Sequence, residues 1–161
     1  MYMKCVGLLE KRGVRREDIA ECVLFLQKQY IEDLHITQCL KMVDDVLHKR
    51  EVQHAIITAI ELDRSAEQGS MIDQDLRHLL MQDAPLYGID EVLAYGICHL
   101  YGSIAITNFG YIDKVKPGII GKLNTHQEGV CHTFLDDIVG AIAAAAAGKL
   151  AHGNSRSEQE G

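Results

Sequence analysis

Hydrophobic residues along this chain recur every three or four positions, which is the spacing of one face of an α-helix. The clearest stripe consists of Ile19, Cys22, Val23, Leu26 and Tyr30. Stripes of this kind predict helices over residues 2–12, 16–30, 51–68 and 73–82, and a further helix with Thr37 as its N-cap. No segment alternates hydrophobic and polar residues as a half-buried strand does. The pattern therefore predicts an all-α fold.

Two segments differ from these amphipathic stripes. Residues 92–109 contain no Asp, Glu, Lys or Arg over eighteen positions, a length at the margin for a membrane span. Glycines and polar residues such as Asn108 lower its hydrophobicity, so a buried central helix surrounded by other helices is the favoured interpretation. The second segment, 133–150, carries five consecutive alanines, and we expect this last helix to pack closely against the central one.

These segments together predict one multihelical bundle, with six or more helices around a central apolar helix. A chain of 161 residues is long enough to bury a substantial core in one domain. The predicted domain covers residues 1–152. Residues 153–161, GNSRSEQEG, are polar and are expected to form a disordered tail.

Charge and cysteine content exclude several classes of protein. The net charge of −7 argues against broad nucleic-acid binding, which needs a cationic face, and weakly opposes adsorption to anionic lipid. The five cysteines are odd in number and form no CxxC pair, so we expect reduced packing residues in a cytosolic protein. The apolar run at the N-terminus is too short for a signal peptide.

Candidate chemistry lies at the starts of two predicted apolar helices. Asp90 and Glu91 precede the uncharged segment, and Asp136 and Asp137 open the alanine-rich helix. Paired carboxylates supply the oxygen ligands that Mg²⁺ binds in proteins, usually together with water and substrate phosphate oxygens. If the last helix packs on the central one, the two acidic pairs come close together.

A lysine-rich loop lies between the two acidic pairs in sequence. Asp113, Lys114 and Lys116 come just before the break at Pro117-Gly118, and a loop of about twenty residues is expected to follow. Lysines can hold a phosphate group and stabilise charge on its oxygens during transfer. The combination suggests metal-assisted phosphoryl chemistry, although both lysines could equally be solvated loop charges.

The acidic pairs also have a purely structural interpretation. Thr133 and Asp136 have the spacing of a capping box, with Asp in place of Glu or Gln. Acidic residues in the first turn of a helix favour its dipole by about 0.3–1 kcal/mol each. His126 and His132 flank Cys131, but their spacing matches no standard zinc pattern.

Three motifs resemble the phosphatidylglycerophosphatase A family. They are YGIDEVLAYGI, GYIDKVKPGIIGKL and TFLDDIVGAIAAA, in this order, over about residues 87–150. The family pattern has a DE pair before an apolar helix, a D-x-x-K-P loop and a DD pair before a small-residue helix. The N-terminal half, which includes LHKREVQHAIITAIELD, is similar to the soluble branch of the family in Gram-positive bacteria, described as a helical bundle with one central helix.

The resemblance implies Mg²⁺-dependent hydrolysis of phosphatidylglycerophosphate to phosphatidylglycerol and phosphate, at the cytoplasmic face of the membrane. Separately from the resemblance, a buried helical core in a subunit of 17.9 kDa makes a homo-oligomer a general expectation. Carried over residue by residue, the metal ligands would be Glu91, Asp113, Asp136 and Asp137. The catalytic carboxylates would be Asp90, Glu91 and Asp137, with the general base unassigned, and the phosphate-binding residues would be Lys114 and Lys116.

The chain also departs from the family pattern, which leaves alternatives open. Membrane members carry several spans and an N-terminal G-T-x-G-S segment, and this sequence has neither. A phosphatase for another soluble phosphate monoester is one alternative. A helical domain without catalytic activity that self-associates or binds a ligand is another, and a peripheral lipid-binding module is a third.

Overall fold

The computed structural model describes the backbone of residues 1–159 and the side chains up to residue 153. Over this part of the chain the structure contains nine α-helices and no strand, which confirms the all-α prediction. The helices are α1 (Tyr2–Lys11), α2 (Arg16–Gln27), α3 (Ile36–Leu47), α4 (Arg50–Gln68), α5 (Gln74–Met81), α6 (Ile89–His99), α7 (Ser103–Val115), α8 (Ile119–Asn124) and α9 (Leu135–Gln159).

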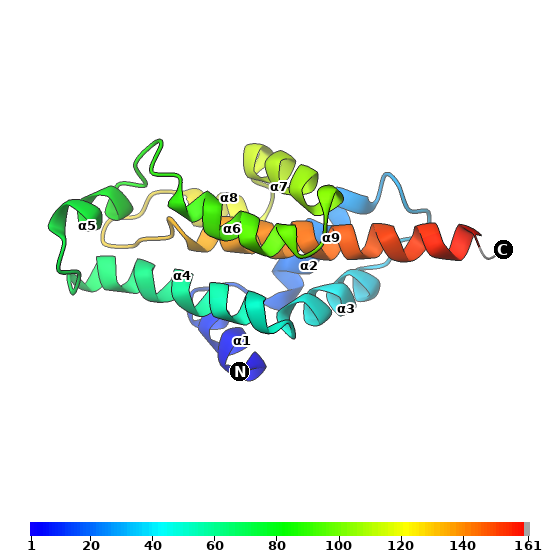
Figure 1. The fold of residues 1–161 in the computed structure, drawn as a ribbon, viewed down its shortest axis with the longest axis horizontal. Helices are drawn as coiled ribbons and strands as arrows, with labels where there is room; N and C mark the ends of the chain where they lie inside the picture. The colour runs from blue at the N-terminus through cyan, green and yellow to red at the C-terminus, as the bar shows by residue number, and fades with distance from the viewer. Residues whose placement is uncertain (160–161) are drawn as a thin grey trace.

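The central helix of the bundle is α9. It runs along the long axis of the molecule, with α6 and α7 on one side and α2, α3 and α4 on the other (Figure 1). Every residue from Thr133 to Gly148 is buried, including all five alanines from Ala143 to Ala147. A helix with such small side chains can be surrounded on all sides only if its neighbours approach closely. At Gly148 a Cβ atom would lie 3.2 Å from the backbone nitrogen of Ala105 on α7.

The prediction of one buried central helix over residues 92–109 is therefore wrong. This segment forms parts of two helices, α6 and α7, which are separated at Gly102, where φ is +86°. Both helices bury one face against α9, and their outer faces expose Val92, Tyr95 and Ile106. An absence of charge thus marks helices that cover α9, not a helix that is covered on every side.

Several helix boundaries also differ from those expected. Thr37 is not an N-cap, because α3 begins at Ile36 with His35 at the cap position, two residues before Thr37, and the His35 N–H donates to the side chain of Gln38. The loop expected after Pro117 contains the short helix α8. The last helix continues past the predicted end to Gln159, so the described part of the expected tail is helical, and residues 160–161 lie outside the described part of the chain.

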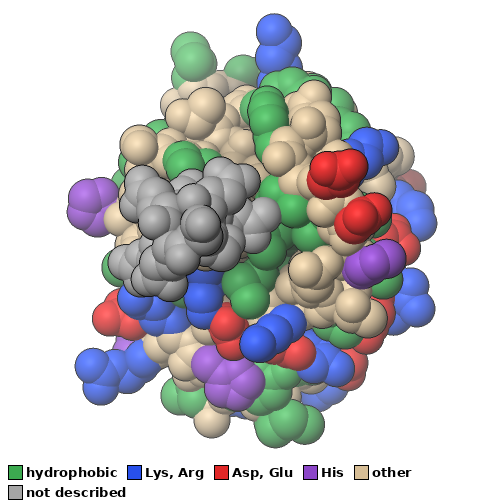
Figure 2. Space-filling view, turned by 90° about the vertical axis from the view of Figure 1, so that its right-hand side faces the viewer, with side chains coloured by type: hydrophobic (Ala, Val, Ile, Leu, Met, Phe, Trp, Pro, Cys, Tyr) green, Lys and Arg blue, Asp and Glu red, His purple; other side chains and the backbone are tan. Residues whose placement is uncertain are grey.

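Two further predictions concern the state of the cysteines and the possibility of a membrane span. All five cysteines are free and buried, as expected for reduced packing residues. Among the described residues, no helix combines the length and the hydrophobicity that crossing a membrane requires. Figure 2 views the molecule toward the C-terminal end of α9, where acidic and basic side chains are interspersed on the surface.

Candidate functional site

The two acidic pairs meet Asp113 and Lys116, at the end of α7, around one cavity of about 450 Å³. It lies where the first turns of α6 and α9 approach the end of α7. Its charged lining residues are Asp83, Asp90, Glu91, Asp113, Lys116, Asp136 and Asp137. Six carboxylates thus face one lysine among the described residues that line the cavity. The closeness of the two acidic pairs, expected from the sequence, is confirmed.

The pair on α6 lies at the open edge of the cavity. Gly88 precedes the helix with φ at +71°, a left-handed conformation that glycine adopts without steric cost. Asp90 is half-buried, and its Oδ1 accepts a hydrogen bond from the backbone N–H of Glu91 at 2.9 Å. The side chain of Glu91 is exposed to solvent. This carboxylate can therefore reach the cavity without any cost of burial.

The pair on α9 lies at the inner wall. Asp136 and Asp137 are only 5% and 6% exposed. Asp136 accepts a hydrogen bond from the backbone N–H of Asp137 at 2.9 Å, and its other oxygen is 3.5 Å from the Nζ atom of Lys116. Two adjacent carboxylates are thus held out of water with one lysine between them and Asp113.

This arrangement changes the protonation of the inner pair. Burial raises the pKa of Asp136 to about 7, against the attraction of Lys116. Burial, together with the charges of Asp136, Asp90 and Asp113, raises the pKa of Asp137 to about 9. Burial also raises the pKa of Asp90. Carboxylates with raised pKa values lack enough positive charge around them, which is the condition that a bound divalent cation relieves.

Lys116 is fixed in the cavity by its backbone and by its partners. It ends α7 in the left-handed conformation, with φ at +49°, which is uncommon for a residue other than glycine. Its Nζ donates to Asp113 at 2.7 Å. Burial lowers the pKa of Lys116, but the bond to Asp113 and the charges of Asp136 and Asp137 outweigh it, so the pKa is raised and the lysine stays cationic.

Gly121 allows helix α8 to pack closely against the backbone of Lys116. A Cβ atom at this position of α8 would lie 2.6 Å from the backbone oxygen of Lys116, closer than real contacts allow. Helix α8 can therefore pack under the lysine only with glycine here. The sequence alone does not show why glycine is needed here, because the close contact forms only when α8 packs against the end of α7.

Lys114 and the geometry of the carboxylates do not match the expectations fully. The side chain of Lys114 is exposed, and it is not among the residues that line the cavity. No three carboxylate, histidine or cysteine side chains of the described residues converge closely enough to hold a metal ion as they stand. The carboxylates share a cavity and have the oxygen chemistry that Mg²⁺ prefers, so the donor set fits a divalent cation, with side-chain movement needed to close around it.

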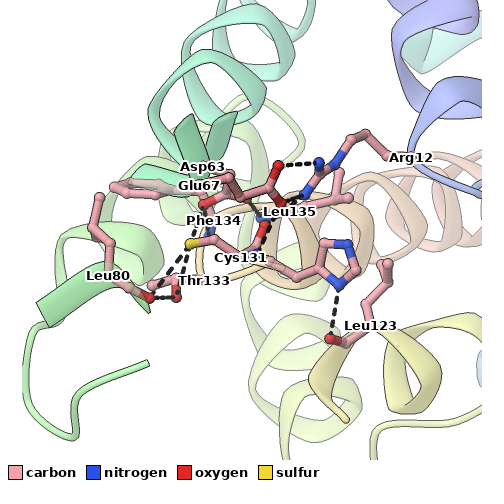
Figure 3. A network of polar contacts seen from close by, with 10 residues as sticks. Arg12, Asp63, Glu67, Leu80, Leu123, Cys131, Thr133, Phe134 and Leu135 are labelled. Carbon is pink, nitrogen blue, oxygen red and sulfur yellow. Dashed lines mark hydrogen bonds and ion pairs between the residues drawn. The ribbon is translucent and has the colours of Figure 1, made fainter. Parts of the chain in front are cut away.

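Sequence reasoning missed the residue that caps α9. The carboxylate of Asp63 on α4 accepts hydrogen bonds from the backbone N–H groups of Phe134 and Leu135 (Figure 3). The expected capping box of Thr133 and Asp136 does not form, because the hydroxyl of Thr133 donates to the carbonyl of Leu80 instead. Asp63 lies more than seventy residues from α9 in sequence, and only its position on the buried side of α4 could have drawn attention to it.

Several known proteins are similar to this chain over nearly its whole length. The chain is 56% identical over 152 residues to the uncharacterized protein YutG of Bacillus subtilis strain 168, covering 94% of this chain and 91% of that protein. The crystal structure of the low temperature requirement C protein of Listeria monocytogenes superposes with a TM-score of 0.93 at 54% identity, covering 96% of each chain. The structure of YpjQ from Bacillus subtilis gives a TM-score of 0.91 at 47% identity, covering 96% of this chain and 95% of that one.

The three motifs that line the cavity are also those that carry the resemblance to a family. The match to that family extends over residues 5–152 and so includes the N-terminal helices as well as the acidic pairs. The resemblance inferred from the motifs is confirmed: this chain belongs to the phosphatidylglycerophosphatase A family.

Proposed function

We propose that this protein is a Mg²⁺-dependent phosphomonoesterase that hydrolyses phosphatidylglycerophosphate to phosphatidylglycerol and phosphate. The observation that carries the proposal is the gathering of six carboxylates and Lys116 around one cavity. Membership of the family supports the substrate class. A cavity this acidic repels a phosphate group unless a cation is present, so a divalent ion is a necessary part of the proposal.

The residues that would hold Mg²⁺ are Glu91, Asp113, Asp136 and Asp137, all of which line the cavity. When bound, the ion supplies Lewis-acid polarisation of the phosphoryl oxygens. The two α9 carboxylates would offer ligand oxygens held in place on a buried wall, whereas Glu91 would offer an exposed ligand that can move. Because their pKa values are raised, Asp136 and Asp137 would release protons if they bound the ion.

The hydrolytic step transfers a phosphoryl group to water. A new bond forms between phosphorus and the water oxygen, and the bond from phosphorus to the ester oxygen breaks. A carboxylate of the cavity accepts the proton that the water loses and passes it to solvent, and the leaving alkoxide takes up a proton from solvent to become the alcohol. Lys116, whose ammonium group stays cationic beside Asp113, stabilises the charge on the phosphoryl oxygens.

The surroundings of the cavity favour a substrate with both polar and apolar parts. A second cavity of about 240 Å³ shares Asp83, Asn124 and Asp136 with the first and is lined by polar side chains that include Thr125 and Gln127. It offers room and hydrogen bonds for a glycerol-like group next to the phosphate.

The rim of the acidic cavity also carries an exposed apolar side chain. Leu86 lines it and is fully exposed, at 103% of its reference area. Ile89 and Val92, which flank Asp90 and Glu91 in the sequence of α6, are 53% and 63% exposed. Exposed apolar residues beside a polar site are typical of contact with an apolar ligand or a lipid surface. This rim favours a lipid phosphate over a small soluble phosphate monoester.

The test is phosphate release from phosphatidylglycerophosphate in mixed micelles and from glycerol phosphate, each with Mg²⁺, with Mn²⁺ and with EDTA. We expect release from the lipid in the presence of Mg²⁺ and none in EDTA. Release that is unchanged in EDTA would contradict the metal mechanism, and preference for glycerol phosphate would contradict the lipid substrate. Vesicle binding without release would instead identify a lipid-binding module.

A thermal melt separates this proposal from a helical domain without catalytic activity. A ligand that binds only the native state stabilises it, so millimolar Mg²⁺ should raise the melting temperature. Carboxylates that act only as helix caps should give almost no response. Self-association stays a prediction, which gel filtration with light scattering can check.

A further inference from the structure

The first turn of α9 is held by a carboxylate from another helix. Asp63 accepts hydrogen bonds from the backbone N–H groups of Phe134 and Leu135, at 3.1 and 3.0 Å. Each carboxylate oxygen serves one N–H, so both peptide groups are fixed in direction as well as in position. Asp136 and Asp137 follow at the next two positions of the chain.

An ion pair holds the residue that leads into this turn. Glu67 accepts a hydrogen bond from the backbone N–H of Cys131 at 2.8 Å, and Arg12 donates to the carbonyl oxygen of the same residue at 2.6 Å. Arg12 and Glu67 are also paired with each other (Figure 3). The backbone donor and acceptor of Cys131 are therefore both bound by partners on other elements.

A third contact comes from α5. The hydroxyl of Thr133 donates to the carbonyl oxygen of Leu80 at 2.6 Å, and the thiol of Cys131 lies 3.4 Å from the same oxygen. Residues 131–134, which form the approach to α9, are thus fixed by residues on α4 and α5 and by Arg12 just after α1. All of these partners lie in the first half of the chain. The acidic cavity is lined instead by the segment that follows α5, by the ends of α6, α7 and α8, and by Asp136 and Asp137 of α9 itself.

A buried carboxylate is a costly helix cap if its only role is to stabilise the fold. The side chain of Asp63 is fully buried, and burial raises its pKa to about 7 although the two N–H groups oppose this shift. A Ser or Thr side chain within the approach segment could cap the helix at less cost. Thr133 is in that segment but its hydroxyl is turned to Leu80. What Asp63 adds is a two-point attachment of α9 to α4.

We propose that Asp63 is a positioning residue, which fixes the first turn of α9 so that Asp136 and Asp137 face the acidic cavity and thereby sets the affinity of the cavity for a divalent cation. The identity of the ion rests on the proposed function, whereas the placement of the two carboxylates does not. Groups that orient metal ligands through hydrogen bonds have measurable effects on metal affinity.

The test uses the full chain with Asp63→Asn. The amide has the same shape but offers one acceptor oxygen and an NH₂ donor, so one of the two N–H groups loses its partner. We expect Mg²⁺ to bind about tenfold more weakly in isothermal titration calorimetry well below the melting temperature. We also expect a crystal structure of the variant to show both carboxylates displaced from their positions in the wild-type protein.

Asp44→Asn is the matched control. Asp44 accepts hydrogen bonds from Arg16 and Tyr2 and joins α3 to α1 and α2, and these partners differ from those that hold the start of α9. Its loss should lower stability without changing Mg²⁺ affinity. If Asp63→Asn does not fold, Asp63→Glu replaces it, because Glu keeps two acceptor oxygens but reaches one methylene farther and should displace the same turn.

The outcomes separate this inference from the proposed function. If the wild-type protein binds no Mg²⁺, the proposed function fails, and the crystal structure of the Asp63 variant alone decides the positioning role. A displaced first turn of α9 supports the role. An unmoved first turn, or an Mg²⁺ affinity equal to that of the wild-type protein, overturns it.

Discussion

At the start of α6, Asp90 accepts a hydrogen bond from the backbone N–H of Glu91 at 2.9 Å. At the start of α9, Asp136 accepts the same bond from Asp137, also at 2.9 Å. The local geometry is thus shared, but Glu91 is exposed whereas both aspartates of α9 are almost fully buried. Similar acidic helix starts can therefore lie in different environments, and we expect burial to decide which of the two pairs gains more from a bound cation.

The largest expected effect is on catalysis, and it separates the two pairs. Asp137→Asn should reduce phosphate release by about two to three orders of magnitude, because it removes a fixed charge from the buried wall. Glu91→Gln should cost about tenfold, because an exposed ligand can be replaced by water. Rates at saturating Mg²⁺ check this, with circular dichroism as the control for folding. Equal losses in the two variants would remove the distinction between the pairs.

A second comparison concerns Lys116, which partly offsets the charge of the α9 pair, and Lys114, which does not line the cavity. Lys116→Met should lower phosphate release by about a hundredfold, because its ammonium group lies 3.5 Å from Asp136 and faces the cavity. Lys114→Met should change release by less than about twofold, since an exposed charge is screened by solvent. Steady-state kinetics on both variants provide the measurement, and a large loss for Lys114→Met would mean that this lysine reaches the substrate.

The raised pKa values of the α9 pair predict a pH-dependent affinity for Mg²⁺. Cation and protons compete for Asp136, with its pKa at about 7, and for Asp137, with its pKa at about 9. Affinity should therefore rise between pH 6 and 9, by about tenfold per pH unit for each proton displaced. Calorimetry in buffers of different protonation enthalpy measures the protons released. A flat profile would show that both carboxylates are already ionised without metal.

The smallest expected effect is on the stability of the metal-free protein. The pKa values of Asp136 and Asp137 are raised above the value of 3.8 that an exposed aspartate has, so the folded chain binds more protons than the unfolded chain at intermediate pH. Stability in EDTA should therefore fall as the pH rises from about 4 through 7 toward 9.

Two aspartate variants sharpen this last prediction. Asp136→Asn should raise the melting temperature at pH 8 in EDTA by about 2–4 °C, which corresponds to about 1 kcal/mol for a chain of this size. Asp90→Asn should change it less, because Asp90 is only half-buried. Thermal melts of both variants with and without Mg²⁺ provide the check. A lower melting temperature for Asp136→Asn would mean that Lys116 already compensates the buried charge.

Much of the helical layout could be predicted from the spacing of apolar residues. The helix over Tyr2–Lys11 and the one ending at Gln68 before Gly69 lie close to their expected positions. Short local signals failed where tertiary contacts compete with them. Thr37 and Thr133 both have capping character, yet the first is not at a cap position and the second bonds to Leu80.

The sequence also misidentified the central helix, for a physical reason. Residues 92–109 have the stronger hydrophobic character, but hydrophobicity measures the preference of a side chain for burial and not the space around it. The alanines of α9 leave room for neighbours on all sides, so the bundle closes around this helix. The helices with larger side chains pack on α9 with one face only, so residues of α6 such as Val92 and Tyr95 remain exposed on the outer surface.

The sequence by itself determined the helical class, the family and the residue types of the site, because helical periodicity and short motifs are local properties. Only the tertiary structure decided which acidic pair is buried, which lysine enters the cavity and that Asp63 holds the first turn of α9. These features depend on contacts between residues far apart in the chain, since the burial and charge around a side chain are set by the elements that pack against it.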